Sequence, residues 1–264
     1  MLMPFITAGF PDLETTVRLI PALERAGAGV CEIGLPFSDP IADGPVIASS
    51  MHEALARGLR LAEIFDAVRA VRSQSNMGLV AMVSWSIVHR RQPQAFIDEC
   101  AGSGFDGLIF PDLPLEESAE ARALAAQSGL TCSLLIAPTT PADRAAAIAR
   151  ASTGFVYLLA RTGITGVREE TPEIESRVKM LREVTDLPIA CGFGIGSAAA
   201  VAAVTQHADA AIVGSAIVQR LADAREAPID QRVATVESFV RELAAGLAAR
   251  QRGVPPFPEK NSPK

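Results

Sequence analysis

The sequence predicts an α/β protein that folds as a single (β/α)8 barrel. Eight short apolar runs alternate with amphipathic stretches along the chain, which is the pattern of repeated strand–helix units. Several of the runs are continuously apolar, as is typical of parallel strands covered on both faces. The chain has 264 residues, and one domain of eight such units commonly uses about 250. A doubly wound open sheet is the alternative architecture.

The apolar runs define where the strands are expected. Each interval between them is long enough for a crossover helix, which parallel strands require. The expected strands are residues 3–8, 30–34, 78–84, 107–110, 131–137, 155–159, 188–191 and 210–213.

Helical patterns fill the intervals between these strands. Asp12 is the expected N-cap of the first helix, which ends near Gly27. Residues 61–71 show the same period, and the last helix is expected over residues 231–249. Three prolines stand where first turns begin, a position that proline favours: Pro114, Pro141 and Pro172.

The chain is expected to form one catalytic domain, residues 1–250, followed by a tail. The tail, residues 251–264, is rich in proline and is expected to be disordered. The longest interval follows the second strand and carries an extra loop and helix, residues 37–58. Long loops in compact domains usually have a function, so this segment is a candidate part of the site.

Composition excludes several classes of protein. Lys and Arg number 24 against 30 Asp and Glu, so the net charge is −6 and no basic patch is available for nucleic acid. The longest strand-like run, residues 78–88, already contains Ser84 and Ser86, so no segment is a membrane span. The N-terminus has no signal-peptide pattern. The four cysteines have no C-x-x-C spacing and are expected to be buried thiols rather than disulfides or zinc ligands, which indicates a cytoplasmic protein.

Acidic residues stand near the end of the second strand, where a barrel places its chemistry. With a period of two, Glu32 shares a face with Val30 and Gly34. If this face lines the lumen, burial raises the pKa of Glu32 and makes it a general acid. The alternative is a structural glutamate paired with an arginine. Asp39 and Asp43 precede Pro and Gly in the next loop, so the simpler interpretation of both is that they form turns.

Three glycine-rich segments follow three adjacent strands and together predict a phosphate site. Residues 161–166 follow the sixth expected strand, residues 192–197 the seventh and residues 214–216 the eighth. Glycines let backbone N–H groups approach an anion, and helix N-termini add partial positive charge. Tight turns alone are the alternative. The segment GFGIGS is not a dinucleotide fingerprint, because Ser197 stands where the third glycine is needed.

The few lysines and histidines of the chain stand at positions that exclude two aldolase mechanisms. The three lysines, Lys179, Lys260 and Lys264, lie in a helix pattern and in the tail, so none stands at a strand end to form a Schiff base. The three histidines have no metal-ligand spacing, so no metal site is expected. What remains is acid–base chemistry by carboxylates on a phosphorylated substrate that supplies its own electron sink.

Six motifs, in this order and spacing, resemble the tryptophan synthase α chain family: PFITAGFPD, EIGLPFSDPIADGP, PDLPLEES, YLLARTGITG, GFGI and IVGSAIV. The resemblance covers residues 3–247. It implies a TIM barrel that cleaves indole-3-glycerol phosphate to indole and glyceraldehyde 3-phosphate in tryptophan biosynthesis. Protonation of the indole ring at C3 supplies the electron sink. The resemblance also implies an α2β2 complex with a β chain that carries pyridoxal phosphate, whereas this chain needs no cofactor of its own.

The resemblance assigns roles to individual residues. Glu32 would be the general acid and base that protonates C3 and takes the glycerol hydroxyl proton. Asp43 would hold the indole N–H and stabilise the cation. The positions that match substrate-binding residues are Phe5, Asp112, Tyr157, Thr165 and Phe193. The positions that match phosphate-binding residues are Gly166, Gly194, Gly214 and Ser215.

Two features differ from the family pattern. The family has a helix before the first strand, whereas here Met3 and Pro4 already open that strand, so the covering helix is expected to be missing. Residues 83–94, VSWSIVHRRQPQ, replace a segment that contains tyrosine and asparagine with serines and basic residues. That loop faces the β chain in the family, so the change concerns docking of the partner rather than catalysis.

Three other functions remain open from the sequence. The altered loop motivates a free-standing indole-3-glycerol-phosphate lyase. A non-catalytic protein that modulates the β chain is another alternative. The last is a different phosphate-binding barrel, such as an isomerase or synthase of the same pathway, and the PFSDPxADGP loop argues against it.

Overall fold

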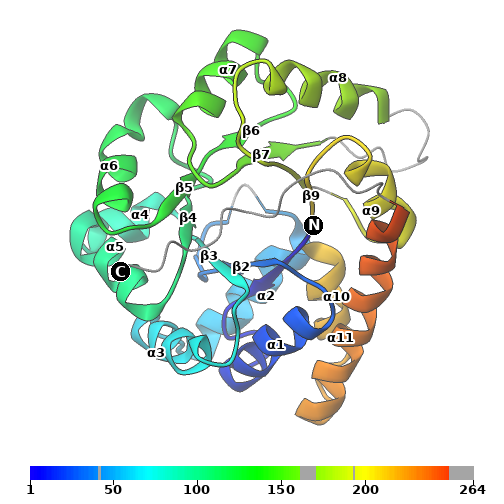
Figure 1. Ribbon diagram of the computed structural model, residues 1–264. Coiled ribbons are helices and arrows are strands. Elements are labelled where there is room, and N and C mark those ends of the chain that lie inside the picture. The colour runs from blue at the N-terminus through cyan, green and yellow to red at the C-terminus, as the bar shows by residue number, and fades with distance from the viewer. Residues whose placement is uncertain (41–42, 161–170, 193, 250–264) are drawn as a thin grey trace.

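The computed structural model describes residues 1–40, 43–160, 171–192 and 194–249, which form a parallel barrel surrounded by helices (Figure 1). Its nine described strand segments pair in the order β5-β4-β3-β2-β1-β9-β8-β7-β6. The two ends of this order, β5 and β6, are consecutive in the chain, so the sheet forms a nearly closed barrel; the (β/α)8 class is confirmed and the open sheet is excluded. The strands are β1 (Leu2–Thr7), β2 (Val30–Gly34), β3 (Gly78–Met82), β4 (Gly107–Ile109), β5 (Thr131–Ser133), β6 (Leu135–Ile136), β7 (Val156–Leu159), β8 (Ile189–Gly192) and β9 (Ala210–Val213).

The barrel closes within residues 131–137, which were expected to form one strand. The structure divides this run at Leu134, because β5 pairs with β4 and β6 pairs with β7. The N–H of Leu134 donates to Ser152 Oγ at 3.3 Å, and its carbonyl accepts from the N–H of Tyr157 at 3.2 Å. The expectation of one continuous strand is therefore wrong, because the chain changes from one edge of the sheet to the other at this residue.

Helices fill the intervals between strands, largely where the sequence predicts them. α1 (Leu13–Arg25) and α3 (Leu61–Arg72) match their expected ranges. The last expected helix divides into α11 (Ile229–Ala245) and the 3-10 turn η2 (Gly246–Ala249). The other helices are α2 (Pro45–Ala56), α4 (Trp85–Arg90), α5 (Pro93–Ser103), η1 (Leu115–Glu117), α6 (Ala119–Gln127), α7 (Ala142–Ala151), α8 (Thr171–Arg182), α9 (Ala198–Thr205) and α10 (Ser215–Asp223).

Several expectations about the ends and surfaces of the chain can be placed on this fold. β1 is the first described element. The expected tail, residues 251–264, lies outside the described residues. No helix in the described ranges is both long and apolar enough to cross a membrane. The four cysteines are buried and unbonded, as expected, at Cys31, Cys100, Cys132 and Cys191.

The first and last helices pack against each other and close the ring (Figure 1). Asp12 caps α1, because its Oδ1 accepts from the N–H of Thr15 at 2.7 Å. Its other carboxylate oxygen accepts from Arg232 of α11. A second pair, Arg25 with Glu237, joins the same two helices at 2.9 Å. The cap predicted from sequence thus also ties the two ends of the barrel together.

One aspartate and its hydrogen-bond partners join β3 and β4 at the N-terminal ends of these strands. Asp106 lies just before β4, and its carboxylate accepts from the N–H of Leu79 at 2.9 Å. The guanidinium of Arg72, at the end of α3, donates to the same carboxylate at 3.2 Å. The N–H of Asp106 donates to the carbonyl of Leu79 at 2.7 Å, so Asp106 makes two hydrogen bonds to one residue of the neighbouring strand.

The same arrangement recurs between β8 and β9. Asp209 lies just before β9, and its carboxylate accepts from the N–H of Ile189 at 2.9 Å and from the guanidinium of Arg182 at the end of α8. The N–H of Asp209 donates to the carbonyl of Ile189 at 2.9 Å. We call these two clusters, Arg72–Asp106–Leu79 and Arg182–Asp209–Ile189, the base clasps.

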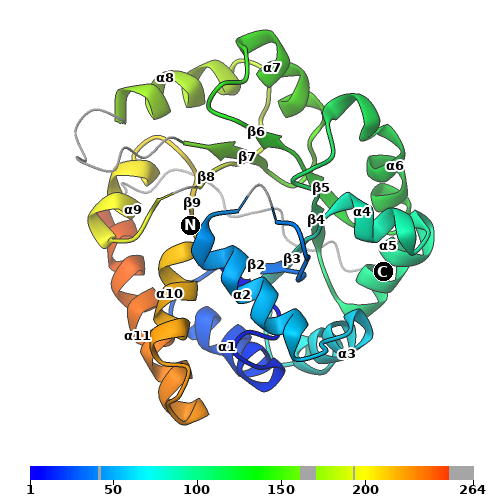
Figure 2. The same cartoon turned by 180° about the vertical axis from the view of Figure 1, so that it is seen from behind.

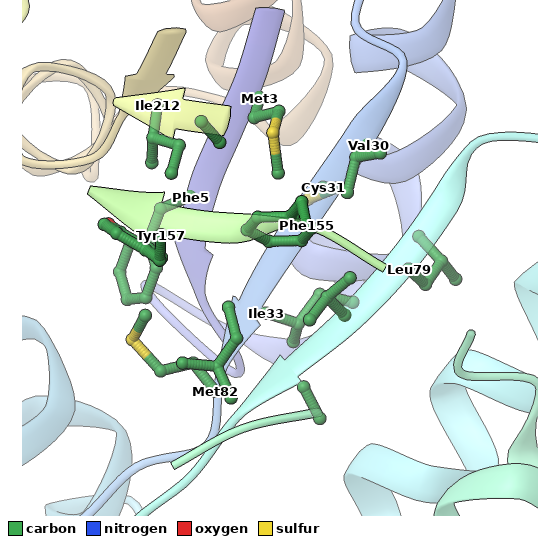
Figure 3. Packing of buried hydrophobic residues seen from close by; sticks show 14 of the residues in the cluster. Met3, Phe5, Val30, Cys31, Ile33, Leu79, Met82, Phe155, Tyr157 and Ile212 are labelled. Atoms are coloured by element: carbon green, nitrogen blue, oxygen red, sulfur yellow. The ribbon is translucent and has the colours of Figure 1, made fainter. Parts of the chain in front are cut away.

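The lumen of the barrel is packed with side chains from alternate strand positions. Figure 3 shows Phe5, Tyr157 and Met82 gathered toward the C-terminal ends of their strands, while Met3 and Phe155 lie nearer the opposite end. In the view from behind, α2 lies alongside α10 (Figure 2). The extra helix after β2, α2, therefore packs on the barrel beside α10 and contacts the first strand.

Candidate active site

Glu32 is the third residue of β2, and its carboxyl group is buried in the lumen. Its side chain is 0% exposed, and neither oxygen has a hydrogen-bond partner among the described residues. Strand register places Phe5 on one side of it and Val80 on the other. Burial raises the pKa of Glu32 from 4.5 to about 8. The side chain is therefore protonated at neutral pH and can donate a proton, and no arginine pairs with it in the described structure.

Asp43 lies two residues before α2 and faces a cavity despite its place in a turn. Its N–H donates to the carbonyl of Pro40 at 3.1 Å. Gly44 then caps α2, and Pro45 occupies the first turn of the helix. Burial raises the pKa of the Asp43 carboxyl group. Asp43 thus leads into α2 and lines a cavity, and its role in the reaction stays a prediction.

Tyr157 on β7 completes a group of three ionisable side chains. Burial, and then the negative charges of Glu32 and Asp43, raise the pKa of its hydroxyl above the usual value. The ring fits against β8 only because residue 192 is glycine. A Cβ there would lie 2.8 Å from the Tyr157 hydroxyl oxygen, which is closer than real Cβ atoms come to such a group.

A cavity of about 360 Å³ opens beside Asp43 and Tyr157, and we call it the substrate cavity; Glu32 is not among its lining residues, but its register partner Phe5 is. Asp43 and Tyr157 line it, together with Phe5. Its apolar walls were missed by the sequence analysis: Ile47, Met82, Pro111, Leu135, Leu159 and Ile212. The alternation that placed Glu32 in the lumen would have indicated Met82, which pairs in register with Gly34 on the same face.

One end of the substrate cavity is suited to an anion. Gly194, Gly214 and Ser215 line it, and Ser215 is the first residue of α10. The amide groups of a first helical turn point outward with partial positive charge. A Cβ on Gly214 would lie 3.4 Å from Cδ1 of Ile47, an ordinary contact distance, so this part of the cavity lies close to α2. Three further expected site residues, Thr165, Gly166 and Phe193, lie outside the described residues.

A second cavity of about 510 Å³ adjoins the first, and we call it the side cavity. The two cavities share Asp43, Met82 and Pro111. The side cavity continues along Leu35, Phe37 and Met51, and polar groups line it at Asp39, Ser84, Ser86 and Asp112.

Asp112 lines the side cavity and holds the start of α4 in place. Its carboxylate accepts from Ser84 Oγ at 2.6 Å and from the N–H of Trp85 at 2.8 Å. Trp85 in turn packs edge-on against Phe110, with ring centroids 5.2 Å apart. Asp112 therefore organises the wall of the side cavity, a role that no local pattern in the sequence indicated.

Comparison with known proteins decides the family of this chain. A family model described as tryptophan synthase alpha chain matches residues 1–248. The chain belongs to the tryptophan synthase α chain family. It is 42% identical over 248 residues to the tryptophan synthase alpha chain of Microcystis aeruginosa, covering 93% of both chains. It is 43% identical over 248 residues to that of Thermosynechococcus vestitus, covering 93% of this chain and 91% of the relative.

Solved structures of tryptophan synthase have the same fold. The chain is similar to one from Mycobacterium tuberculosis in its aminoacrylate-bound form, with a TM-score of 0.82 and 33% identity over 93% of this chain and 92% of the other. It is also similar to a chain of the Pyrococcus furiosus tryptophan synthase complex, with a TM-score of 0.82 and 32% identity over 92% and 96% of the two chains.

Residues 83–94, which were expected to differ from the family pattern, comprise α4, the residues beside it and the start of α5. Ser84 caps α4 through the N–H of Ser86 at 3.3 Å. His89 and Arg90 at the end of this helix are exposed, and Arg91 pairs with Glu99 at 2.9 Å. The basic residues of this segment thus lie on the surface, while its serines line the side cavity.

Proposed function

We propose that Glu32 and Asp43 carry out the reaction of the family in this chain, the cleavage of indole-3-glycerol phosphate to indole and glyceraldehyde 3-phosphate in tryptophan biosynthesis. The observation that carries this proposal is the unpartnered, buried carboxyl group of Glu32, with a pKa of about 8. Its register partner Phe5 lines the substrate cavity, and so do Gly194, Gly214 and the first residue of α10, Ser215. A protonated acid whose neighbour lines a cavity with an anion-binding wall matches a phosphorylated substrate that must be protonated to react.

The proposed chemistry moves one proton onto the substrate and takes one from it. Glu32 donates its proton to C3 of the indole ring, which leaves a cation across C2 and the ring nitrogen. Asp43 accepts a hydrogen bond from the ring N–H and stabilises this positive charge. The Glu32 carboxylate then takes the proton of the hydroxyl group on the carbon attached to C3. That carbon becomes an aldehyde, the bond to C3 breaks, and its electron pair returns to the ring to give indole.

The remaining expected residues position the substrate in this proposal. Gly194, Gly214 and Ser215, together with Gly166, bind the phosphate through backbone N–H groups and the Ser215 hydroxyl. Phe5 and Tyr157 enclose the indole ring, with Thr165 and Phe193 beside it. Asp112 acts through α4 rather than on the reacting atoms, because Ser84 and Trp85 already donate to its carboxylate. General acid catalysis of this kind contributes roughly 10²–10⁴ in rate.

The β chain is the proposed partner, in an α2β2 complex in which the β chain holds pyridoxal phosphate and this chain needs no cofactor. The complex is proposed to work in the cytoplasm without nucleic acid or membrane. The altered segment at residues 83–94 favours a second candidate, a free-standing lyase. High turnover without any β chain would support this candidate, and stimulation by the β chain would reject it. A protein that raised β-chain activity and released no indole would be a modulator instead.

The experiment that tests the proposal compares Glu32→Gln with the native chain. The variant keeps the shape of the side chain and removes its acidity, so indole release from indole-3-glycerol phosphate should be abolished while the substrate still binds. Indole release is measured with and without the β chain, and binding by calorimetry. The matched control is Glu120→Gln on exposed α6, which should keep native turnover. Retained turnover in Glu32→Gln would remove Glu32 from its assigned role.

A further inference from the structure

The substrate cavity ends against the side cavity, and the cleavage reaction leaves the side cavity without an assigned occupant. The boundary between the two consists of Asp43, Met82 and Pro111, the residues that line both. The side cavity is the larger, about 510 Å³ against about 360 Å³. A ligand that filled the substrate cavity would therefore meet a larger space at this boundary.

The orientation of the substrate determines which of its parts reaches the boundary. This step rests on the proposed function, which places the phosphate at Gly194, Gly214 and Ser215 and the indole N–H at Asp43. The indole ring is the end of the substrate that is remote from the phosphate. Because Asp43 is a boundary residue, the ring lies against Met82 and Pro111. Substituents on the benzene part of the ring are the atoms nearest to the side cavity.

Met82 is the adaptable part of this boundary. It is the last residue of β3, is 8% exposed, and pairs in register with Gly34. Figure 3 shows it beside Phe5 and Tyr157 in the lumen. An unbranched thioether changes rotamer readily and repacks around ligands of different shape. Pro111, by contrast, is a rigid part of the boundary.

The walls of the side cavity indicate what it can accept. Leu35, Phe37 and Met51 supply apolar surface, while the hydroxyl groups of Ser84 and Ser86 lie 2.8 Å apart and line the same space. We propose that the side cavity is a subsite for substituents on the benzene ring of the indole, and that Met82 determines whether they enter. The substrate class is ring-substituted indole-3-glycerol phosphates that carry a small apolar group or a hydroxyl group. Such groups are remote from C3, so the proton transfers at C3 are unchanged.

A bromine atom tests the location directly. The full chain is crystallised with 5-bromoindole-3-propanol phosphate, which lacks the hydroxyl group needed for cleavage, and the anomalous signal of bromine is measured. The expected peak lies in the side cavity, between Met82 and Ser86. A peak elsewhere overturns the proposal, as does failure of the brominated compound to bind when indole-3-propanol phosphate itself binds.

Kinetics test the role of Met82 and separate it from the proposed function. The measured quantity is kcat/KM for 5-bromoindole-3-glycerol phosphate divided by kcat/KM for the unsubstituted substrate. Met82→Ala should raise this ratio about tenfold, the scale of discrimination by one apolar group in a pocket. Ser86→Phe, which fills the side cavity, should lower it at least about tenfold. Ser49→Phe makes the same change at an exposed residue of α2 that lines neither cavity, and should leave the ratio unchanged.

Two results would overturn the subsite and one would overturn the function beneath it. A ratio that is the same in the native chain, Met82→Ala and Ser86→Phe rejects the subsite, as does rejection of the brominated substrate by all three proteins. Met82→Ala removes a buried side chain and therefore also affects folding. Ser86→Phe changes a surface residue, so it provides a second measurement of the ratio that does not depend on the core. Absence of turnover with the unsubstituted substrate in the native chain contradicts the proposed function itself.

Discussion

A Cβ atom on Gly34 would lie 2.5 Å from Cζ of Phe5, so the phenyl ring occupies the space that any side chain at residue 34 would need. Gly34→Ala should therefore displace the ring from the wall of the substrate cavity. We expect kcat/KM for indole-3-glycerol phosphate to fall about tenfold, which corresponds to about 1.4 kcal/mol of lost transition-state stabilisation. Overpacking should also lower the free energy of unfolding by about 1–3 kcal/mol. Indole release and urea unfolding measure the two effects.

Gly102→Ala is the matched control for that substitution. Gly102 lies in α5, and a Cβ there would meet nothing within 4 Å. Alanine should stabilise the helix by about 0.5–1 kcal/mol and leave kcat/KM unchanged. Native kinetics in Gly34→Ala would show that the position of Phe5 does not matter for catalysis.

The acidity of Glu32 should make the stability of the protein depend on pH. Its pKa is 4.5 in an ordinary setting and about 8 in the folded chain. Between these values the folded state holds a proton that the unfolded state has lost, so the stabilising contribution of the protonated group declines as pH rises. Glu32→Gln does not titrate. We therefore compare the free energies of unfolding of Glu32→Gln and of the native chain. Their difference, variant minus native, should increase from pH 5 to pH 8 by on the order of a few kcal/mol.

Urea unfolding at pH 5, 6.5 and 8 measures this difference. Burial of the new amide group adds an offset that is the same at every pH and leaves the slope intact. Glu120→Gln on exposed α6 should give a difference close to zero throughout. A flat difference for Glu32→Gln would mean that the carboxyl group titrates normally in the folded chain.

A hydrogen bond between two buried hydroxyl groups should fix the position of α2 and therefore that of Asp43, which precedes this helix. Thr7 Oγ1 and Ser50 Oγ lie 2.6 Å apart, each in a residue that is 1% exposed. Ser50 donates its proton to the carbonyl of Ile47 at 2.7 Å, so Thr7 is the donor between the two hydroxyl groups. Ser50→Ala leaves the Thr7 hydroxyl buried without its acceptor, at a cost of about 1–3 kcal/mol. Because Asp43 leads into this helix, the KM for indole-3-glycerol phosphate should also rise.

A double-mutant cycle with Thr7→Val isolates the pair. Removing both hydroxyl groups should destabilise the chain less than the sum of the two single changes, because no unpaired group remains. Additive losses of unfolding free energy would show that the two hydroxyl groups do not interact.

The base clasps should contribute to stability and not to catalysis. Asp209→Ala removes the acceptor of the Ile189 N–H and of the Arg182 guanidinium, at an expected cost of about 2–4 kcal/mol. Asp209→Asn keeps one acceptor oxygen and should lose less. Both variants should retain native kcat/KM under conditions where they are folded, since the clasp lies at the opposite end of the strands from the substrate cavity. A fall in kcat/KM without loss of stability would contradict this division.

Local patterns in the sequence predicted features that depend on few neighbours. The Asp12 cap follows from residue type, and the structure confirms it. A period of two put Glu32 on one face of its strand and left open which face lines the lumen; its register with Phe5 decides this (Figure 3). The division of the fifth strand at Leu134 was not predictable in this way, because it depends on which edge of the sheet each half meets. The capping of α4 by Asp112 joins residues 27 and 28 positions apart. Thr165, Gly166 and Phe193 stay predictions.

The two base clasps have a geometric consequence at the other end of the barrel. Counting β5 and β6 as one strand, the clasps join strands three and four and strands seven and eight, so a shift of four units superimposes one on the other. This shift carries Leu79 onto Ile189, and therefore Val80 onto Ala190. In strand register, Val80 pairs with Glu32 and Ala190 pairs with Tyr157. Glu32 and Tyr157 thus occupy equivalent places in two half-barrels, and the pseudo-twofold symmetry of the base ends where these two residues differ.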